Sequence, residues 1–434
     1  MVVVPPGLPY DPAGTTARQQ HRLLGPQPMN VILIEPAFPS YQRHFARALK
    51  TIGANVTAVG ERPIDHLDGE LQGWLTRYFQ VRSVTDEQEL LNVVRHVQSF
   101  EWVDRLEATI EAHVLPAARV REATGIPGTS VRTAYLCRDK PVMKDALRAA
   151  GIPVAQSIGT DDPKEVRAFA AAVGLPIVIK PRDAAGASGT FKASSQDELE
   201  RALHDSGVAR RAPVAVEEWV EGHEGFIDTL TVGGHIHHSF VTHYFPNVLE
   251  AMRTRWISPQ MVATNAVEAD VYDEVRRVAA AVNAALGINT TATHMEWFFG
   301  PKGLKVSEIG CRPPGVNHWD LYNDANEMDI YRDWALAVTH GRTEQRPSRR
   351  YACGLVALRP DRDGVISGYE GADRVFSDLG DQITASHFPA LGTPTQGVAA
   401  GFMANAWMRV RMPDFDDLRR TLNWIGETIQ IHAK

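Results

Sequence analysis

The order of apolar and polar residues predicts that the chain opens with an α/β unit. Residues 30–35 (NVILIE) form a short apolar run that ends at a proline, which is typical of a buried strand. Phe45, Leu49 and Ile52 then recur at helical spacing, and a second apolar run follows at residues 55–59. A strand, a helix and a strand in this order favour a parallel sheet. The first turn lacks a GxGxxG pattern, so nothing here indicates a dinucleotide site.

The next part of the pattern predicts a small α+β unit, and later parts predict antiparallel strands. The small unit is expected to contain helices over 139–150, 161–173 and 195–204 and strands over 175–180, 191–193 and 214–220. Two strands turning at Gly233-Gly234 and a helix over 271–286 follow. Beyond residue 346 we expect a β-rich tail that is closed by a helix over 415–429.

Two aromatic-rich apolar runs flank a Gly-Pro-Lys-Gly sequence at residues 300–303 and predict a β-hairpin. Proline early and glycine last suit a three-residue loop, because the last loop residue must adopt positive φ. The resulting register sets Phe298 opposite Val306 and Glu296 opposite Glu308. Like charges placed directly opposite each other repel, so something should compensate the two carboxylates.

A divalent cation bridging Glu296 and Glu308 is the simplest compensation, since Mg²⁺ takes one or two carboxylates together with phosphate oxygens. The alternative is an ordinary surface hairpin whose glutamates turn apart into water. Alternation by twos assigns neighbouring residues to the two faces of the hairpin. The face of the glutamates carries His294, Gly310 and Arg312, and the opposite face, expected in the core, carries Met295, Trp297, Ile309 and Cys311.

Composition narrows the class of protein. The 434 residues are 44% apolar and 22% charged, as in an ordinary soluble globular protein, and a net charge of −7 disfavours a nucleic-acid partner. The three cysteines, Cys137, Cys311 and Cys353, lack a CxxC spacing, which favours a reducing compartment over a structural zinc site. No apolar run approaches a membrane span. Residues 1–27 are rich in Pro and Gly and predict a disordered arm, so a cytoplasmic protein is the default expectation.

Two segments have the composition of ligand-binding loops. Residues 183–190 are small, which lets backbone N–H groups approach an anion, and Ser188, Thr190 and the preceding Lys180 add donors. This segment is not a Walker A motif, and a flexible surface turn is the alternative. Residues 217–224 (EEWVEGHE) form an acidic strand end that could present backbone groups to an adenine and a carboxylate to a ribose. A solvated acidic turn is the alternative there.

Three histidines near the Gly-Gly turn form a possible metal cluster. The three are His235, His237 and His238, of which His235 and His237 would alternate onto one face of a strand. An exposed strand is favoured over a metal site. Cys311 is expected to pack in the core rather than act as a nucleophile.

The order of these motifs resembles the ATP-grasp superfamily, and in particular its carboxylate–amine ligase branch, which includes L-amino acid ligases. The motifs are Lys140, VIKP around Lys180 with its small-residue loop, EEWVEGHE, and the hairpin with Glu296 and SEIGCRPPG around Glu308. The resemblance implies a fold of α/β and α+β parts. These parts are a disordered arm (1–27), an N-terminal β-α-β pre-ATP-grasp domain (28–127), an ATP-grasp domain with a central antiparallel sheet (128–345) that includes a lid subdomain (about 150–220), and a β-rich C-terminal domain (346–434).

The resemblance also implies roles for single residues. The ATP phosphates would be contacted by Lys140 and Lys180 and covered by a loop with Gly186, Ser188, Gly189 and Thr190. The adenine hinge would consist of Glu217, Glu218, Trp219 and Val220. The ribose would be bound by Glu224. Glu296 and Glu308 would bind one or two Mg²⁺ ions, with Mn²⁺ as an alternative. Arg312 and Lys180 are the implied catalytic residues. One departure is Gly310, where many relatives carry Asn as a third metal ligand, so a water or another residue such as Asn317 would have to serve.

The activity implied by the resemblance is an ADP-forming ligation of a carboxylate to an amine through an acyl phosphate. The partners are then two small molecules, with no nucleic acid and no membrane, and a homodimer is expected. A biotin-carboxylase-like enzyme is one alternative, although the tail has no Met-Lys-Met segment. A nucleotide-binding scaffold without turnover is another. Neither substrate can be deduced from the sequence, because loops shape acceptor pockets.

Overall fold

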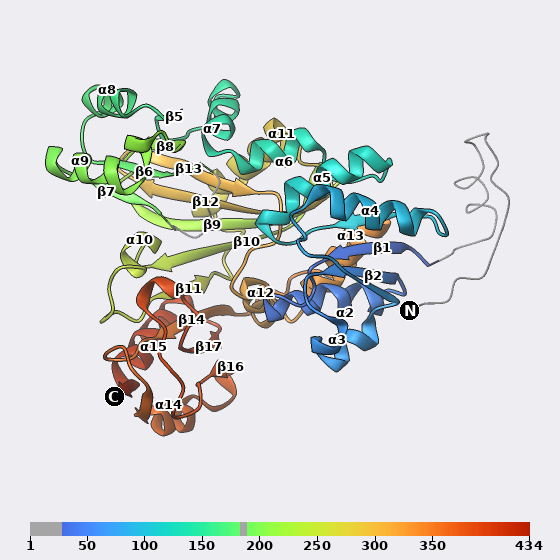
Figure 1. Cartoon of the computed structure of the whole chain (residues 1–434). Helices are drawn as coiled ribbons and strands as arrows, with labels where there is room; N and C mark the ends of the chain where they lie inside the picture. The colour runs from blue at the N-terminus through green and yellow to red at the C-terminus, as the bar shows by residue number, and fades with distance from the viewer. Residues whose placement is uncertain (1–27, 183–188) are drawn as a thin grey trace.

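The structure is a computed structural model that describes residues 28–182 and 189–434. The expected arm at residues 1–27 and the loop residues 183–188, which include Gly186 and Ser188, lie outside the described residues. Within the described part, the strands form four sheets, and no helix there is both long and apolar enough to cross a membrane. Figure 1 shows a central sheet between the N-terminal and C-terminal parts of the chain.

The N-terminal unit is the α/β structure that the apolar pattern predicted. Its parallel sheet has the order β3-β2-β1-β4. The strands are β1 (Asn30–Ile34), β2 (Asn55–Gly60), β3 (Arg77–Gln80) and β4 (Arg105–Glu107), and the helices are α2 (Arg43–Thr51), α3 (Gly69–Trp74), α4 (Glu87–Gln98) and α5 (Glu111–Thr124). Phe45 and Leu49 on α2 are buried, as their helical spacing requires.

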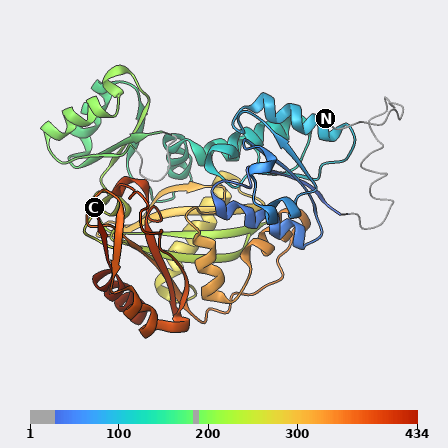
Figure 2. The same cartoon turned by 60° about the horizontal axis from the view of Figure 1, so that its bottom comes forward.

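The small unit is an antiparallel sheet with two helices, and Figure 2 shows it standing out from the rest of the chain. The sheet order is β5-β8-β6-β7. Its elements are β5 (Ser157–Thr160), α8 (Pro163–Val173), β6 (Ile177–Pro181), β7 (Phe191–Ala193), α9 (Gln196–Asp205) and β8 (Val214–Glu218). Two helices precede it, α6 (Val131–Arg138) and α7 (Lys140–Ala149). The side chain of Asp139 caps α7, because it accepts a hydrogen bond from the backbone N–H of Val142 at 3.1 Å.

The central sheet has eight antiparallel strands in the order β13-β12-β9-β10-β11-β14-β17-β16. Three strands of the C-terminal part extend this sheet, and two others pair in a separate sheet. The strands are β9 (His223–Val232), β10 (His235–Phe245), β11 (Gln260–Ala263), β12 (Thr291–Gly300), β13 (Gly303–Gly310), β14 (Ala352–Leu358), β16 (Ile383–His387) and β17 (Ala406–Met412). Helices α10 (Val248–Ala251), α11 (Asp273–Leu286), α12 (His318–Asn326), α13 (Ile330–His340), α14 (Ala372–Leu379) and α15 (Phe415–Thr428) and a ribbon of β15 (Ile366–Glu370) with β18 (Gln430–Ala433) complete the chain.

The β12-β13 hairpin confirms the facing glutamates but corrects part of the expected register. Glu296 pairs with Glu308, whereas Phe298 pairs with Lys305 and not with Val306. A bulge after Glu296 shifts the pairing, and Gly300 pairs with Gly303, so the loop has two residues rather than three. The alternation of residues along a strand predicts regular pairing, so it does not show where an extra residue interrupts that pairing.

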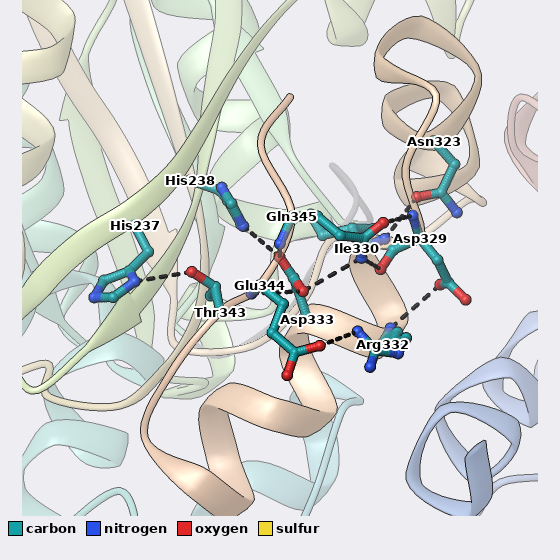
Figure 3. A network of polar contacts seen from close by, with 10 residues as sticks. All are labelled: His237, His238, Asn323, Asp329, Ile330, Arg332, Asp333, Thr343, Glu344 and Gln345. Atoms are coloured by element: carbon teal, nitrogen blue, oxygen red, sulfur yellow. Dashed lines mark hydrogen bonds and ion pairs between the residues drawn. The ribbon is translucent and has the colours of Figure 1, made fainter. Parts of the chain in front are cut away.

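A buried carboxylate on α13 ties this helix to β10 and to the loop that follows the helix (Figure 3). Asp333 accepts hydrogen bonds from Nε2 of His238 at 2.7 Å and from the backbone N–H groups of Glu344 and Gln345 at 3.2 and 3.1 Å. His237 is exposed and contacts the Thr343 hydroxyl in the same loop at 3.0 Å. The neighbouring histidines therefore differ in burial, and the buried His238 serves the core of the fold.

Candidate functional site

One cavity of about 1080 Å³ lies among the small unit, the central sheet, the N-terminal unit and the C-terminal strands. It is larger than most small-molecule sites, which span roughly 300–1,000 Å³, so a nucleotide and a second molecule can share it. Ten of the residues expected at the site line this cavity. They are Lys140, Lys180, Thr190, Glu217, Glu218, Trp219, Val220, Glu224, Glu296 and Glu308.

Two lysines and a glutamate form a buried ion-pair cluster in the cavity wall. The carboxylate of Glu217 on β8 lies 2.6 Å from Nζ of Lys144 and 3.1 Å from Nζ of Lys180 on the adjacent β6. Sequence reasoning missed Lys144, which is 0% exposed. Its place one turn after Lys140 on α7 was the available signal, because residues four apart share a helix face.

The charges of this cluster follow from its burial. Burial favours the neutral acid, but the ammonium groups of Lys144 and Lys180 outweigh it and lower the pKa of Glu217 to about 2. Burial lowers the pKa of Lys144 to about 8, although Glu217 opposes this shift. One carboxylate thus faces two ammonium groups, and the excess positive charge suits a phosphate chain.

The paired carboxylates of the hairpin lie on another part of the cavity wall, and each has a basic neighbour. Glu308 lies 3.3 Å from Nζ of Lys140. Burial would raise the pKa of Glu308, but the positive charges of Lys140 and Lys180 lower it. Glu296 lies 3.5 Å from Nε2 of His294, whose Nδ1 meets Asp228 at 2.7 Å.

The donor set of Glu296 and Glu308 fits a hard divalent cation that takes its remaining ligands from elsewhere. Across residues 28–182 and 189–434, no group of three or more His, Cys, Asp or Glu is arranged to hold a metal by itself. Two carboxylates completed by phosphate oxygens and water are the usual protein contribution to a Mg²⁺ site.

Side chains at the acidic end of β8 and directly after it contact other parts of the protein. Glu218 accepts hydrogen bonds from the backbone N–H of Gln156 at 3.0 Å and from Nζ of Lys302 at 3.4 Å. Trp219 lies under the ammonium of Lys192, 3.8 Å from the ring centroid. These contacts hold the strand end at the cavity wall.

Glu224 lies in the same wall and accepts a hydrogen bond from the backbone N–H of Val248 at 2.6 Å. Burial, with the nearby charge of Glu296, raises the pKa of Glu224 to about 8. The cavity therefore holds a carboxyl group whose charge depends on what binds beside it.

Two expected site residues that the structure describes, Gly189 and Arg312, do not line the cavity. Arg312 is held by the protein. Its Nε donates to the carboxylate of Glu111 at 2.8 Å, and a terminal nitrogen donates to the carbonyl of Pro313 at 2.8 Å. Glu111 begins α5 of the N-terminal unit, 201 positions away along the chain, and no local pattern could have identified it. A Cβ atom at Gly310 would lie 2.8 Å from this carboxylate. Glu111 therefore occupies the space that a side chain at position 310 would need.

Comparisons with known proteins agree with this arrangement. Residues 145–326 match the ATP-grasp domain family. Over 61% of its length the chain is 26% identical to L-arginine-specific L-amino acid ligase of Bacillus subtilis, of which the match covers 67%. Over 48% of its length the chain is 23% identical to alanine–anticapsin ligase of Bacillus subtilis (strain 168). This match spans about half of that relative, 48% of its length.

Solved structures show the same fold. The L-amino acid ligase of Bacillus licheniformis superposes with a TM-score of 0.72 at 16% identity, and the match covers 94% of this chain and 100% of that one. The fold predicted from the motif order is thereby confirmed. The chain therefore contains an ATP-grasp domain over residues 145–326, and it is similar in sequence and fold to amino acid ligases that carry this domain.

Proposed function

We propose that this chain is an ADP-forming enzyme that joins a carboxylate to an amine, using ATP and a divalent cation, Mg²⁺ or Mn²⁺. The observation that carries the proposal is the set of charges around one cavity. Lys140, Lys144 and Lys180 meet there with the paired acids Glu296 and Glu308. A phosphoryl-transfer site needs this arrangement, because its main task is to place and neutralise charge.

In this proposal, different elements around the cavity bind the phosphates, the adenine and the ribose of the nucleotide. The lysines and the loop that ends at Thr190 hold the phosphates, the backbone at Trp219 and Val220 holds the adenine, and Glu224 holds the ribose. Gly189 has a φ of +66°, which favours glycine and lets the loop backbone turn at this position. A cation held by Glu296 and Glu308 would neutralise charge on the phosphate oxygens.

The reaction balances as two substitutions. A carboxylate oxygen attacks the γ-phosphorus of ATP, the bond from that phosphorus to the β,γ-bridging oxygen breaks, and ADP leaves with the electron pair. The amine nitrogen then attacks the acyl carbon, inorganic phosphate leaves, and the nitrogen loses a proton. We assign Lys180 and Arg312 to stabilise the charge that develops during phosphoryl transfer. Arg312 acts from behind the wall, where Glu111 fixes its orientation.

The biotin-carboxylase-like alternative is less suited to this cavity. Bicarbonate is a small anion, and a site for it needs little apolar surface. The cavity has substantial apolar walls from residues 38–41 and 401–407. A non-catalytic nucleotide-binding scaffold would use the same lysines to hold phosphates, so the measurement of ADP formation separates it from an enzyme.

Glu308→Gln tests the proposal. We expect ADP formation to fall at least about 100-fold, because the change removes one carboxylate from the cation site while keeping its size. The matched control is Glu274→Gln, an exposed glutamate on α11, which should leave the rate unchanged. Circular dichroism checks that both variants fold. Full activity in Glu308→Gln, or AMP and pyrophosphate as products of the unmodified chain, would contradict the proposal.

A further inference from the structure

The cavity extends beyond the proposed nucleotide site into a region that we call the apolar half. Its wall comes from the loop before α2, from the segment leading into β17 and from the end of β10. The residues used below are Phe38, Tyr41, Tyr244, Phe402, Met403 and Trp407. Two segments far apart in the sequence, residues 38–41 and 401–407, therefore face the same space.

The apolar half adjoins the place where the phosphoryl group would be transferred. The ring of Phe402 lies 6.0 Å from that of Tyr244. Tyr244 is in turn close enough to Glu296 and Glu308 for their charges to act on its hydroxyl group. On the other side, the Tyr41 hydroxyl lies 3.5 Å from the position that a Cβ atom of Gly315 would occupy. A carboxylate placed for phosphorylation thus has its remaining atoms beside these aromatic rings.

Among the described residues that line the cavity, the two segments of the apolar half contribute no charged side chain. Among the described residues that line it, every Lys, Arg, Asp and Glu falls between positions 140 and 308. The lining residues at 38–41 and 387–407 that the structure describes include none of these four types. A charged group entering the apolar half would lose its hydration without gaining a partner, whereas an apolar group would be removed from water favourably.

We propose that the carboxylate substrate is an acid whose body is uncharged and apolar, either aromatic or long-chain aliphatic, and that acids with a cationic or anionic side chain are rejected. This inference rests on the proposed function. The aromatic rings and the thioether of Met403 supply contacts that flat or flexible apolar groups use well.

The first experiment traps the acyl phosphate, so the natural amine need not be known. Hydroxylamine serves as the amine, with saturating ATP and Mg²⁺, and hydroxamate and ADP are measured. L-phenylalanine, L-leucine and L-methionine are compared with L-arginine, L-lysine and L-glutamate. We expect kcat/KM to be at least about 10-fold higher for the apolar acids. A charged acid as the best substrate would overturn the inference and leave the proposed function standing.

A binding measurement separates failure of the inference from failure of the proposed function. If no acid supports ADP formation, calorimetry with a non-hydrolysable ATP analogue and Mg²⁺ present measures binding of phenylalanine and arginine. Binding of phenylalanine alone upholds the apolar half while the ligase reaction fails. Binding of arginine alone, or of neither acid, overturns the inference.

Substitutions in the wall test which residues set the preference. Met403→Glu should lower kcat/KM for phenylalanine at least about 10-fold and raise it for arginine, whereas Met403→Leu should preserve the preference. The control, Trp256→Glu, adds the same charge at a side chain that is 87% exposed and does not line the cavity. Gln396→Glu, another position in the wall, makes the same test if Met403→Glu does not fold. An unchanged ratio of phenylalanine to arginine in a folded wall variant would refute the assignment.

Discussion

Replacing Glu217 by glutamine should destabilise the protein by about 3–5 kcal/mol, the usual effect of removing one partner from a buried ion pair. Both lysines that contact this carboxylate are largely buried, and Lys144 is entirely so. The lowering of the Glu217 pKa from 4.5 to about 2 gives a similar figure, about 3 kcal/mol. In the variant, the pKa of Lys144 should fall below its present value of about 8, so that Lys144 loses its proton near neutral pH.

The assay is urea denaturation at pH 7, followed by tryptophan fluorescence and compared at equal slopes of the transition. A matched control exists in the same small unit. Glu200 lies 2.7 Å from Arg167, and both side chains are nearly half exposed. Glu200→Gln should therefore change the unfolding free energy by less than about 1 kcal/mol.

A second substitution separates charge from packing. Adding Lys144→Met to Glu217→Gln removes the buried amine that has lost its carboxylate partner, so part of the lost stability should return. Nucleotide affinity should stay weak in the double variant, because one positive charge at the phosphate site is missing. The reasoning is refuted if Glu217→Gln destabilises the protein no more than Glu200→Gln does.

Two further predictions concern other parts of the chain. Gly310→Ala should lower kcat at least about 10-fold with little change in the KM for ATP, because the Cβ atom of the alanine would displace Glu111 and with it Arg312. Steady-state kinetics measures both constants. An unchanged kcat would exclude the positioning role of Glu111. Burial lowers the pKa of His243 to about 3, so between pH 6.5 and 3 the unfolded chain binds a proton that the folded chain does not, and stability falls with acidification. This effect of His243 should lower the free energy of unfolding by about 2 kcal/mol at pH 5. Urea denaturation at pH 7.5 and 5 should therefore show a smaller loss of stability in His243→Gln than in the unmodified protein. An equal loss in both proteins would contradict the assignment.

The sequence by itself determined the features that depend on near neighbours. Helical spacing identified α2, and the helix expected over residues 139–150 is present as α7. Glu296 was correctly expected opposite Glu308, although the structure reaches this pairing through a two-residue loop and a bulge, which offset each other, and not through the expected three-residue loop. Chain connectivity fixes such relations over a few residues. The order of the motifs also indicated the ATP-grasp fold, in which these separated segments meet at one cavity.

Only the tertiary structure decided which distant groups meet. The bulge after Glu296, the pairing of Lys144 with Glu217 and the contact of Glu111 with Arg312 have no counterpart in the periodic pattern. The same holds for the apolar half, whose wall includes segments from opposite ends of the chain. These contacts depend on how sheets and helices stack against one another. Periodicity states which face of an element is buried, but it does not state which other element covers that face.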